Sequence, residues 1–206
     1  LDLGCGDGLF LAKMRMLGWN VTGVEPDTAA AEGARKRWSL DVRAGTIEEA
    51  GLADESFDAI TMNHVIEHLA DPIGTLRDCY RLLRAGGKLV VVTPNSHSLA
   101  SDWFAGDWRG WEPPRHLMLF SSKALSSCVQ GAGFTVHSVR TPASSGRWMW
   151  TQSRLIRRRR EHGGPGITGS EFSWTPGALC LHAAESLRNR WSPVGEEILL
   201  VGIRRP

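Results

Sequence analysis

The chain has 206 residues, which is long enough for one folded domain with a sizeable core and short for two. Hydrophobic residues make up 42% and charged residues 22%, and no apolar run approaches the roughly 18–20 residues that a membrane-spanning helix needs. The net charge of +2 gives no reason to expect a nucleic-acid partner, and four scattered cysteines argue against structural zinc and disulfides, so we expect a reducing, cytoplasmic setting.

Short apolar strands alternate with amphipathic helices over the first half of the chain, a pattern typical of a parallel sheet wrapped by helices. We expect strands at 1–4, 21–25, 41–44, 57–62 and 87–93. We expect helices between them at 9–18, 27–38 and 72–85, the last ended by Gly86-Gly87. A first strand that starts at residue 1 indicates that the chain has lost an upstream segment.

The second half of the chain is less regular. A stretch rich in Trp, Pro and Gly follows Pro94, and residues 95–116 are expected to form a lid-like loop. A helix at 121–131 and a strand at 134–140 follow. We expect residues 145–192 to form an irregular insertion with a basic helix, followed by a last strand at 196–204. The whole chain, 1–206, is therefore predicted to be a single domain.

Three glycines at alternate positions follow the first strand, in the sequence LDLGCGDG at residues 1–8. Glycine permits positive φ and lets a ligand approach the backbone, and the helix start beyond the turn offers free N–H groups. The dinucleotide fingerprint G-x-G-x-x-G would require glycine at position 9, where the chain has Leu9. The spacing Gly4-x-Gly6-x-Gly8 therefore favours a site for a nucleoside joined to an amino acid.

The second strand ends in a carboxylate, in VTGVEPD at residues 21–27. Glu25 lies where the ribose of an adenosine would bind, and its two oxygens can accept hydrogen bonds from both ribose hydroxyls, worth roughly 1.5–3 kcal/mol. The alternative is that Glu25 caps the following helix. Asp27 is the better candidate for that cap.

Four motifs in order resemble the class I S-adenosylmethionine-dependent methyltransferase family: LDLGCGDG, VEPD, ESFDAITMNHVIEHLADP and LLRAGGKLVVVTPN. The resemblance covers residues 1–95 closely and the last strands more loosely. It implies an α/β, Rossmann-like fold with a seven-stranded, mostly parallel sheet, helices on both faces and an antiparallel last strand. It also implies that S-adenosylmethionine lies across the strand ends.

The resemblance further assigns the cofactor-binding residues. Asp2 and the Gly4 carbonyl are expected near the methionine amino group, Glu25 on the ribose, and residues 45–47 beside the adenine. Many family members have aspartate where this chain has Thr46, so the contact to the adenine amine differs here. The full predicted set is Asp2, Gly4, Cys5, Gly6, Gly8, Glu25, Pro26, Gly45, Thr46, Ile47, Asn63 and His64.

The segment after the fourth strand points to a small-molecule methyl acceptor. It lacks the Asn/Asp-Pro-Pro-aromatic motif that holds nucleic-acid amines in this family. The sequences HVIEHLADP and PRHLMLFS resemble the subgroup that methylates oxygen, nitrogen or carbon of small metabolites, and we expect transfer to oxygen. A non-catalytic, S-adenosylmethionine-binding regulatory protein is the alternative.

A hydroxyl acceptor would also need a general base, and histidine is the usual choice near neutral pH. His116 follows the Trp-rich stretch, where a lid would meet the acceptor, and is the first candidate; a structural role at the next helix is the alternative. His64, at the end of the fourth strand, is the second candidate. We expect no metal, because no acidic cluster accompanies these histidines in the sequence.

Two further features allow a functional and a structural interpretation. Trp103, Phe104, Trp108 and Trp111 could close over an apolar or aromatic acceptor, or could form a satellite hydrophobic cluster. The run 157–160 consists of four arginines, which on a helix would face nearly every side. It could be a solvated helix surface, or it could contact an anionic membrane peripherally.

Overall fold

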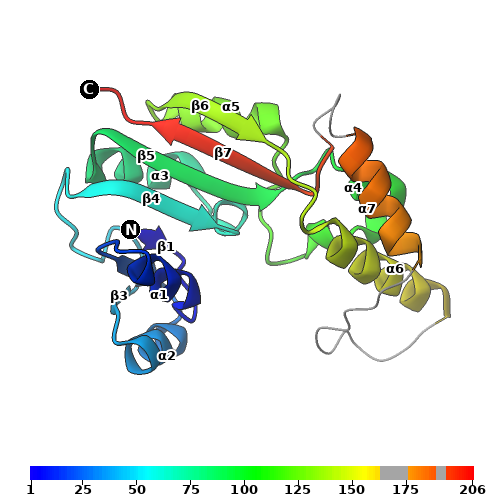
Figure 1. The fold of residues 1–206 in the computed structure, drawn as a ribbon, viewed down its shortest axis with the longest axis horizontal. Helices are drawn as coiled ribbons and strands as arrows, with labels where there is room; N and C mark the ends of the chain where they lie inside the picture. The colour runs from blue at the N-terminus through cyan, green and yellow to red at the C-terminus, as the bar shows by residue number, and fades with distance from the viewer. Residues whose placement is uncertain (163–175, 189–193) are drawn as a thin grey trace.

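A computed structural model describes residues 1–162, 176–188 and 194–206, and these form a seven-stranded sheet in the order β3-β2-β1-β4-β5-β7-β6 (Figure 1). Every neighbouring pair is parallel except those of β7, which runs antiparallel to β5 and β6. The predicted fold class is therefore confirmed. The strands are β1 (Asp2–Leu3), β2 (Thr22–Glu25), β3 (Asp41–Ala44), β4 (Phe57–Asn63), β5 (Leu83–Pro94), β6 (Thr135–Arg140) and β7 (Glu197–Ile203).

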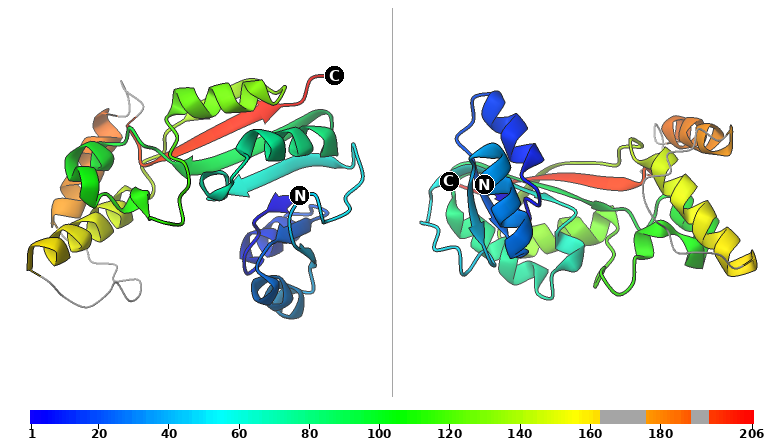
Figure 2. Two further views of the ribbon diagram at one scale, coloured as in Figure 1. Left: turned by 180° about the vertical axis from the view of Figure 1, so that it is seen from behind. Right: turned by 90° about the horizontal axis from the view of Figure 1, so that it is seen from below.

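The helices fall into three groups. The right-hand panel of Figure 2 shows α1 above the edge-on sheet and α3 and α5 below it, while α4, α6 and α7 lie together beyond one end of the strands (Figures 1 and 2). Short 3-10 turns connect the groups. The helices are α1 (Leu9–Met16), α2 (Thr28–Trp38), α3 (Pro72–Leu82), α4 (Leu99–Phe104), α5 (Ser122–Gly131), α6 (Gly146–His162) and α7 (Pro176–Arg188), and the turns are η1 (Ile66–His68), η2 (Ala105–Asp107) and η3 (Arg109–Trp111).

Several helices begin where a short polar side chain accepts from the free backbone amides of the first turn. Asp27 accepts from the amides of residues 29 and 30 and starts α2, as predicted. Asp71 starts α3 in the same way, with Pro72 at the first helical position, where its missing N–H costs nothing. Ser121 starts α5. These caps fix where each helix leaves the end of the preceding segment.

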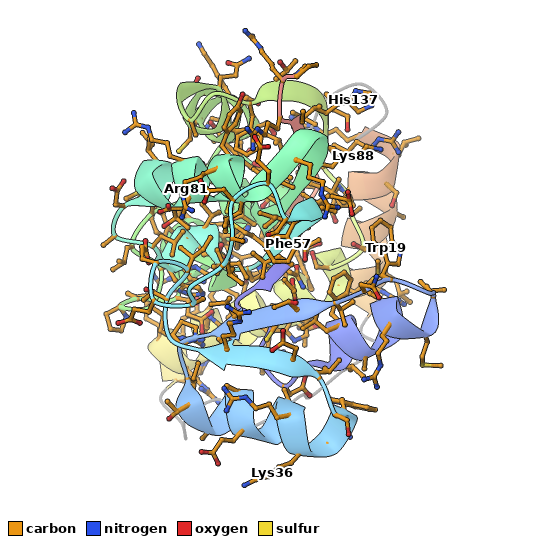
Figure 3. All side chains as sticks on the ribbon, turned by 90° about the vertical axis from the view of Figure 1, so that its left-hand side faces the viewer. Trp19, Lys36, Phe57, Arg81, Lys88 and His137 are labelled. Carbon is orange, nitrogen blue, oxygen red and sulfur yellow. The ribbon has the colours of Figure 1, made fainter. Side chains whose placement is uncertain are left out.

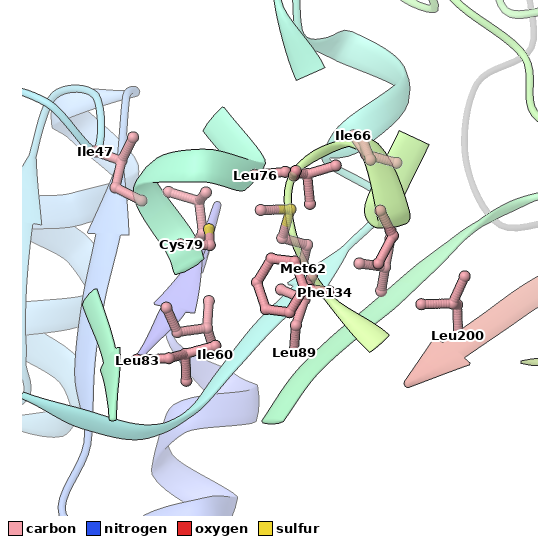
Figure 4. Close-up of a cluster of buried hydrophobic side chains, with 14 of the residues drawn as sticks. Ile47, Ile60, Met62, Ile66, Leu76, Cys79, Leu83, Leu89, Phe134 and Leu200 are labelled. Carbon is pink, nitrogen blue, oxygen red and sulfur yellow. The ribbon is translucent and has the colours of Figure 1, made fainter. Parts of the chain in front are cut away.

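The main core lies between the central strands and the α3–α5 layer. Ile60 and Met62 of β4, Leu76 of α3 and Leu89 of β5 are completely buried, and Phe134 packs onto them from the segment before β6 (Figure 4). Alternate residues of β4 and β5 point into this layer, as the two-residue period of a strand requires. This packing holds the central strands in place, and the candidate site lies at their carboxyl ends.

Most predicted elements of the first 140 residues and the last strand lie within two residues of the observed ones. The helix predicted at 72–85 is an exception, because α3 ends at Leu82 and β5 begins at Leu83, paired with Phe57. Gly86-Gly87 therefore lies inside the strand and does not end the helix. Gly86 has φ of 77°, and its amide donates to the Arg204 carbonyl at 3.0 Å, so it bends the strand next to the chain end.

The segment 95–116 is not a lid without regular structure. It contains α4, η2 and η3, and a hydrophobic cluster of Ala100, Phe104, Trp108 and Met149 anchors it. The predicted insertion at 145–192 contains the expected basic helix, α6, and a second helix, α7. Its residues 163–175 and 189–193 lie outside the described part of the chain.

Charged side chains project outward from the helices, as shown for Lys36 of α2 and Arg81 of α3 (Figure 3). Lys36 pairs with Glu32 at 3.3 Å, one helical turn away, and both side chains are largely exposed, so the pair contributes little to stability. Among the helices that the structure describes, none is long and apolar enough to cross a membrane.

Candidate active site

The strand order reverses between β1 and β4. These neighbouring parallel strands pair directly, yet the chain leaves β1 toward β2 on one side and leaves β4 toward β5 on the other. In such open α/β sheets, ligands bind outside the carboxyl ends of the strands at the point where the order reverses. The predicted site residues follow β1, β2, β3 and β4 at this edge.

The three glycines of the turn after β1 serve different purposes. All three have positive φ. An added Cβ on Gly6 would meet no atom within 4 Å, so this backbone is open to a ligand. On Gly4 it would lie 2.5 Å from Val65, and on Gly8 it would lie 2.8 Å from Leu40. Gly6 therefore provides the cradle, while Gly4 and Gly8 allow close packing of the surrounding chain.

Glu25 connects this turn to the end of β2. Its Oε2 accepts from the Gly6 amide at 2.8 Å, and its Oε1 accepts from the Asp27 amide at 2.9 Å. The Gly45 amide donates to the Glu25 carbonyl at 3.0 Å, which brings the turn after β3 to the same place. Each carboxylate oxygen has a second lone pair that can accept from a ligand hydroxyl.

The side chains of Asp2, in β1, and of Cys5, in the glycine turn, are both buried. Asp2 is 4% exposed, and it accepts from the Thr61 hydroxyl of β4 at 2.5 Å. Burial raises the pKa of Asp2 to about 6. The Cys5 side chain is buried against Gly23, so Cys5 can meet a ligand only through its backbone.

A cavity of about 490 Å³, the strand-end cavity, lies along this edge. Four predicted cofactor residues line it: Gly4, Pro26, Thr46 and Ile47. Its opposite wall comes from the segment after β4 and from the start of α3, which the sequence did not assign. At the position where many family members have aspartate, the Thr46 amide donates to Glu49 at 2.9 Å.

A second cavity of about 330 Å³, the histidine cavity, brings together both predicted bases. His64 and His116 line it although 52 positions separate them in the chain. The remaining wall comes from η3, the start of α6 and the start of β7, and includes Arg109, Glu112, Trp148, Met149 and Glu197.

The two cavities share the segment after β4 as a common wall. His64 and His68 line the histidine cavity, while Val65 and Leu69, each the next residue in the chain, line the strand-end cavity. The two cavities are therefore adjacent along this segment. Asn63 ends β4 just before this wall.

His64 is held between two carboxylates. Its φ of 55° is unusual for a residue other than glycine and directs the ring toward Glu67 and Glu197, each 3.2 Å from a ring nitrogen. The hydrogen bonds to Glu197 and Glu67 raise the pKa of His64 to about 9 despite its partial burial. At neutral pH the ring is therefore charged and donates from both nitrogens.

His116 has a different arrangement. Its side chain is 6% exposed, and its Nδ1 lies 2.7 Å from the Gly110 carbonyl. Since a carbonyl can only accept, Nδ1 carries a hydrogen and donates it. The Nε2 atom lies 3.6 Å from Glu112, whose pKa is lowered by Arg109 beside it although burial opposes this shift. Nε2 is thus the ring nitrogen of His116 that can exchange a proton with a bound molecule.

The histidines do have an acidic neighbour, contrary to the sequence expectation. Glu67, His68 and His116 each offer a potential metal-ligand atom, and these atoms lie within 4.8 Å of one another. The sequence shows no acidic cluster beside these histidines, but the fold brings one acid, Glu67, to them. Glu67 already accepts from the Thr93 hydroxyl at 2.9 Å and binds His64. The prediction that the chain needs no metal stays a prediction.

The aromatic residues expected to close over the acceptor do not line the histidine cavity. Phe104 and Trp108 are 3% and 2% exposed and belong to the satellite cluster with Met149, because the buried Glu196 carboxylate accepts the Trp108 indole N–H at 3.2 Å. Trp103 and Trp111 remain largely exposed. The structural interpretation is therefore confirmed for Phe104 and Trp108.

Two of the four arginines at 157–160 form ion pairs within the fold. Arg157 and Arg160 both pair with the buried Asp107, at 3.1 Å and 2.9 Å, and Arg157 also lies over the Phe104 ring. They tie α6 to η2. A peripheral membrane contact of this run stays a prediction, and two of the four charges it relies on already have a partner.

Sequence reasoning missed the two carboxylates around His64. Glu67 follows His64 by three residues, a spacing that places both on one side of a helical turn, so this pair could have been found. Glu197 is 133 positions away and meets His64 because β7 begins beside the end of β5, and nothing in the sequence signals that contact.

Comparison with known proteins identifies the family. A family model described as a methyltransferase domain matches residues 1–139. The chain belongs to this family. An ubiquinone biosynthesis O-methyltransferase of Cereibacter sphaeroides is 30% identical over 172 residues, 74% of this chain and 67% of that enzyme. Its counterpart from Parvibaculum lavamentivorans is 38% identical over 100 residues, and the match spans 46% of this chain and 40% of that enzyme.

Solved structures show the same fold. A SAM-dependent methyltransferase from Thermotoga maritima superposes with a TM-score of 0.64 and 26% identity, covering 99% of this methyltransferase and 81% of that chain. Geranyl diphosphate methyltransferase, solved in complex with SAM, has a TM-score of 0.63 at 17% identity, covering 98% of this chain and 76% of the other. S-adenosylmethionine is the methyl donor of this family. The open backbone at Gly6 and the Glu25 oxygens beside it fit such a group.

Replacing Glu25 by Ala is expected to weaken S-adenosylmethionine binding by roughly 10-fold or more, because charged hydrogen bonds to the ribose are lost. Isothermal titration calorimetry measures the change. Glu32→Ala is the matched control, since the Glu32 carboxylate lies on the exposed face of α2 and pairs with Lys36. Equal affinities of the two variants would contradict the ribose assignment.

Proposed function

We propose that this methyltransferase transfers the methyl group of S-adenosylmethionine to an oxygen atom of a small-molecule acceptor. The observation that carries the proposal is the shared wall: the strand-end cavity and the histidine cavity lie on either side of the segment after β4. Methyl transfer requires the donor and acceptor atoms to be held in line and close together. Two cavities lined by the same short segment, at the point where the strand order reverses, would place a donor and an acceptor next to each other.

The strand-end cavity is the proposed cofactor site. Glu25 would accept from the ribose hydroxyls, and Pro26 and Ile47 would pack on the adenine. The Asp2 carboxylate and the Gly4 carbonyl would hold the methionine amino group, and an ammonium group there would favour the ionised form of Asp2 against the effect of its burial. The bound cofactor supplies the methyl group and the sulfonium leaving group.

The histidine cavity is the proposed acceptor site, with His116 as the general base. The Gly110 carbonyl fixes the Nδ1 hydrogen, so Nε2 can take the acceptor's hydroxyl proton. The nearby Glu112 carboxylate would then stabilise the resulting positive charge. The Trp148 ring and the Met149 side chain offer apolar surface to the rest of the acceptor.

His64 is not suited to act as the base at neutral pH. Both of its ring nitrogens donate to carboxylates, and its pKa of about 9 keeps the proton in place. It would instead position Glu197 on the cavity wall and hold the buried Glu67 behind it. Transfer to oxygen is favoured because the sequence relatives from Cereibacter sphaeroides and Parvibaculum lavamentivorans are O-methyltransferases by name.

Mass spectrometry of reaction mixtures tests the proposed activity directly. With S-adenosylmethionine present, a panel of phenols, hydroquinones and sugars is expected to yield at least one product heavier by one methylene unit (about 14 Da). The same product is expected with and without EDTA, because the proposed base is an amino-acid side chain.

Cofactor binding without any methylated product would favour the non-catalytic alternative. Activity that disappears in EDTA and returns with a divalent cation would identify Glu67, His68 and His116 as a metal site and would remove His116 from the role of base.

His116→Ala is expected to lower turnover by roughly 10²-fold or more, the usual scale for a general base, with little change in cofactor affinity. The loss is expected to shrink as the pH rises, because the acceptor then ionises without help. His137→Ala is the matched control, since His137 lies on the edge strand β6 (Figure 3).

His116→Gln separates two roles, because glutamine can bind a hydroxyl but cannot take its proton. Recovery of most of the activity in this variant would mean that His116 orients the acceptor. Unchanged turnover in both His116 variants would contradict any role of this residue in the reaction.

A further inference from the structure

The interface between α6 and α7 buries a carboxyl group that has no partner. Glu185 of α7 is completely buried, and neither of its carboxyl oxygens accepts a hydrogen bond. Among the described residues, the other buried side-chain atoms without a partner are Ser145 Oγ and Trp150 Nε1, on the segment that enters α6 and on α6 itself. A buried charge without hydrogen bonds is far more costly than a buried neutral group, so this position favours a neutral carboxylic acid.

The Glu185 carboxyl lies directly against the start of α6. The space that a Cβ on Gly146 would need is filled by Glu185, so glycine at the first position of α6 makes room for this side chain. The two helices lie side by side in Figures 1 and 2. Farther along, Gly177 of α7 faces the Trp150 indole nitrogen, which lies 3.3 Å from an ideal Cβ on that glycine.

A second buried acid lies near Glu185 and takes up the available donors. Glu196, just before β7, accepts from the Ser98 hydroxyl at 3.0 Å, the Ala100 amide at 3.0 Å and the Trp108 indole at 3.2 Å. Burial raises the pKa of Glu196 to about 7 although these donors oppose the shift. The Glu185 carboxyl has only the Glu196 backbone amide near it, so its pKa is raised further. Within the pair, the proton therefore belongs on Glu185.

The start of α6 also forms part of the histidine cavity. Ser145, Trp148 and Met149 line that cavity, and they lie on the turn against which Glu185 packs. A change in how α7 is held would therefore change the wall of the histidine cavity.

We propose that α7 is a pH-gated clasp: it docks on α6 with Glu185 neutral, and loss of that proton releases α7 and loosens the adjoining wall of the histidine cavity. The charged groups that act on Glu185 are Glu196, just before β7, and Glu197, the first residue of β7, and both are acidic. A negative charge on Glu185 would thus be repelled by both, and only the Glu196 backbone amide would oppose this repulsion.

The direction of the pH dependence follows from the pKa. Burial, with the charge of Glu196 adding to it, raises the pKa of Glu185 to about 8 in the docked state. A solvated glutamate has a pKa of about 4.3. Docking of α7 is therefore strongest below about pH 4.3. Its equilibrium constant falls by up to about tenfold per pH unit as the pH rises toward 8, and it changes little above that value.

Hydrogen–deuterium exchange of the full chain, read by mass spectrometry as protection factors for peptides within α7, tests the clasp. In the parent protein the α7 protection factor is expected to fall by up to about 100-fold between pH 6 and pH 8. Glu185→Gln copies the neutral acid and is expected to keep α7 protected, with a change below about threefold over the same range. Glu161→Gln, at an exposed position on α6, is the matched control and is expected to behave like the parent.

Either of two results would overturn the proposal. One is α7 protection in the parent that does not change between pH 6 and pH 8. The other is a pH dependence that persists unchanged in Glu185→Gln. The measurement uses neither cofactor nor acceptor, so its outcome is independent of the proposed methyl transfer.

Discussion

Backbone amides that lose their strand partners at the carboxyl ends of β1 and β2 need another acceptor, and the Glu25 carboxylate supplies it. One oxygen accepts from Gly6 in the turn after β1, and the other accepts from Asp27 at the start of α2. The two turns are therefore held together before any ligand arrives. A cradle that is already ordered loses little conformational freedom on binding, so more of the contact energy appears as affinity. These contacts hold the open backbone at Gly6 against Glu25, and Gly4 and Pro26, which line the strand-end cavity, lie in the same two turns.

The histidine cavity depends on a second electrostatic arrangement. The charged His64 ring joins Glu67, which follows β4, to Glu197, which begins β7. Because β7 runs antiparallel to β5, its first residue, Glu197, lies beside the carboxyl end of β5, at the edge where the parallel strands end. Because His64 is already protonated and bound, the general base that we propose is a residue from a different segment, His116. The two cavities consequently share one wall but differ in chemistry.

The first half of the fold could be predicted because each signal is local. Buried parallel strands are short apolar runs, Asp27 is a recognisable helix cap, and the glycine turn requires positive φ. The boundary between α3 and β5 could not be predicted, because Leu82 and Leu83 are both apolar and only tertiary pairing with Phe57 decides which element each one joins. Four of the predicted cofactor residues, Gly4, Pro26, Thr46 and Ile47, line the strand-end cavity because they follow strand ends, whereas His64 lines the histidine cavity.

The second half of the site depends on contacts distant in sequence. Burial of Trp108 follows from the Glu196 carboxylate 88 positions later, so an aromatic segment that could have been a lid became a packed cluster. His116 lines the histidine cavity, and its partners Gly110 and Glu112, which the sequence analysis did not name, fix the orientation of its ring. The Glu67 contact to His64 could have been inferred from spacing, and the Glu197 contact could not.

The most direct test is a crystal structure of the protein with S-adenosylhomocysteine bound. We expect the ribose hydroxyls on the Glu25 carboxylate, the adenine between Pro26 and Ile47, and the sulfur facing the wall between the two cavities. The Gly6 backbone should contact the ligand without rearrangement. A ligand bound away from the glycine turn, or one that leaves Glu25 with its two backbone amides alone, would contradict this account of the site.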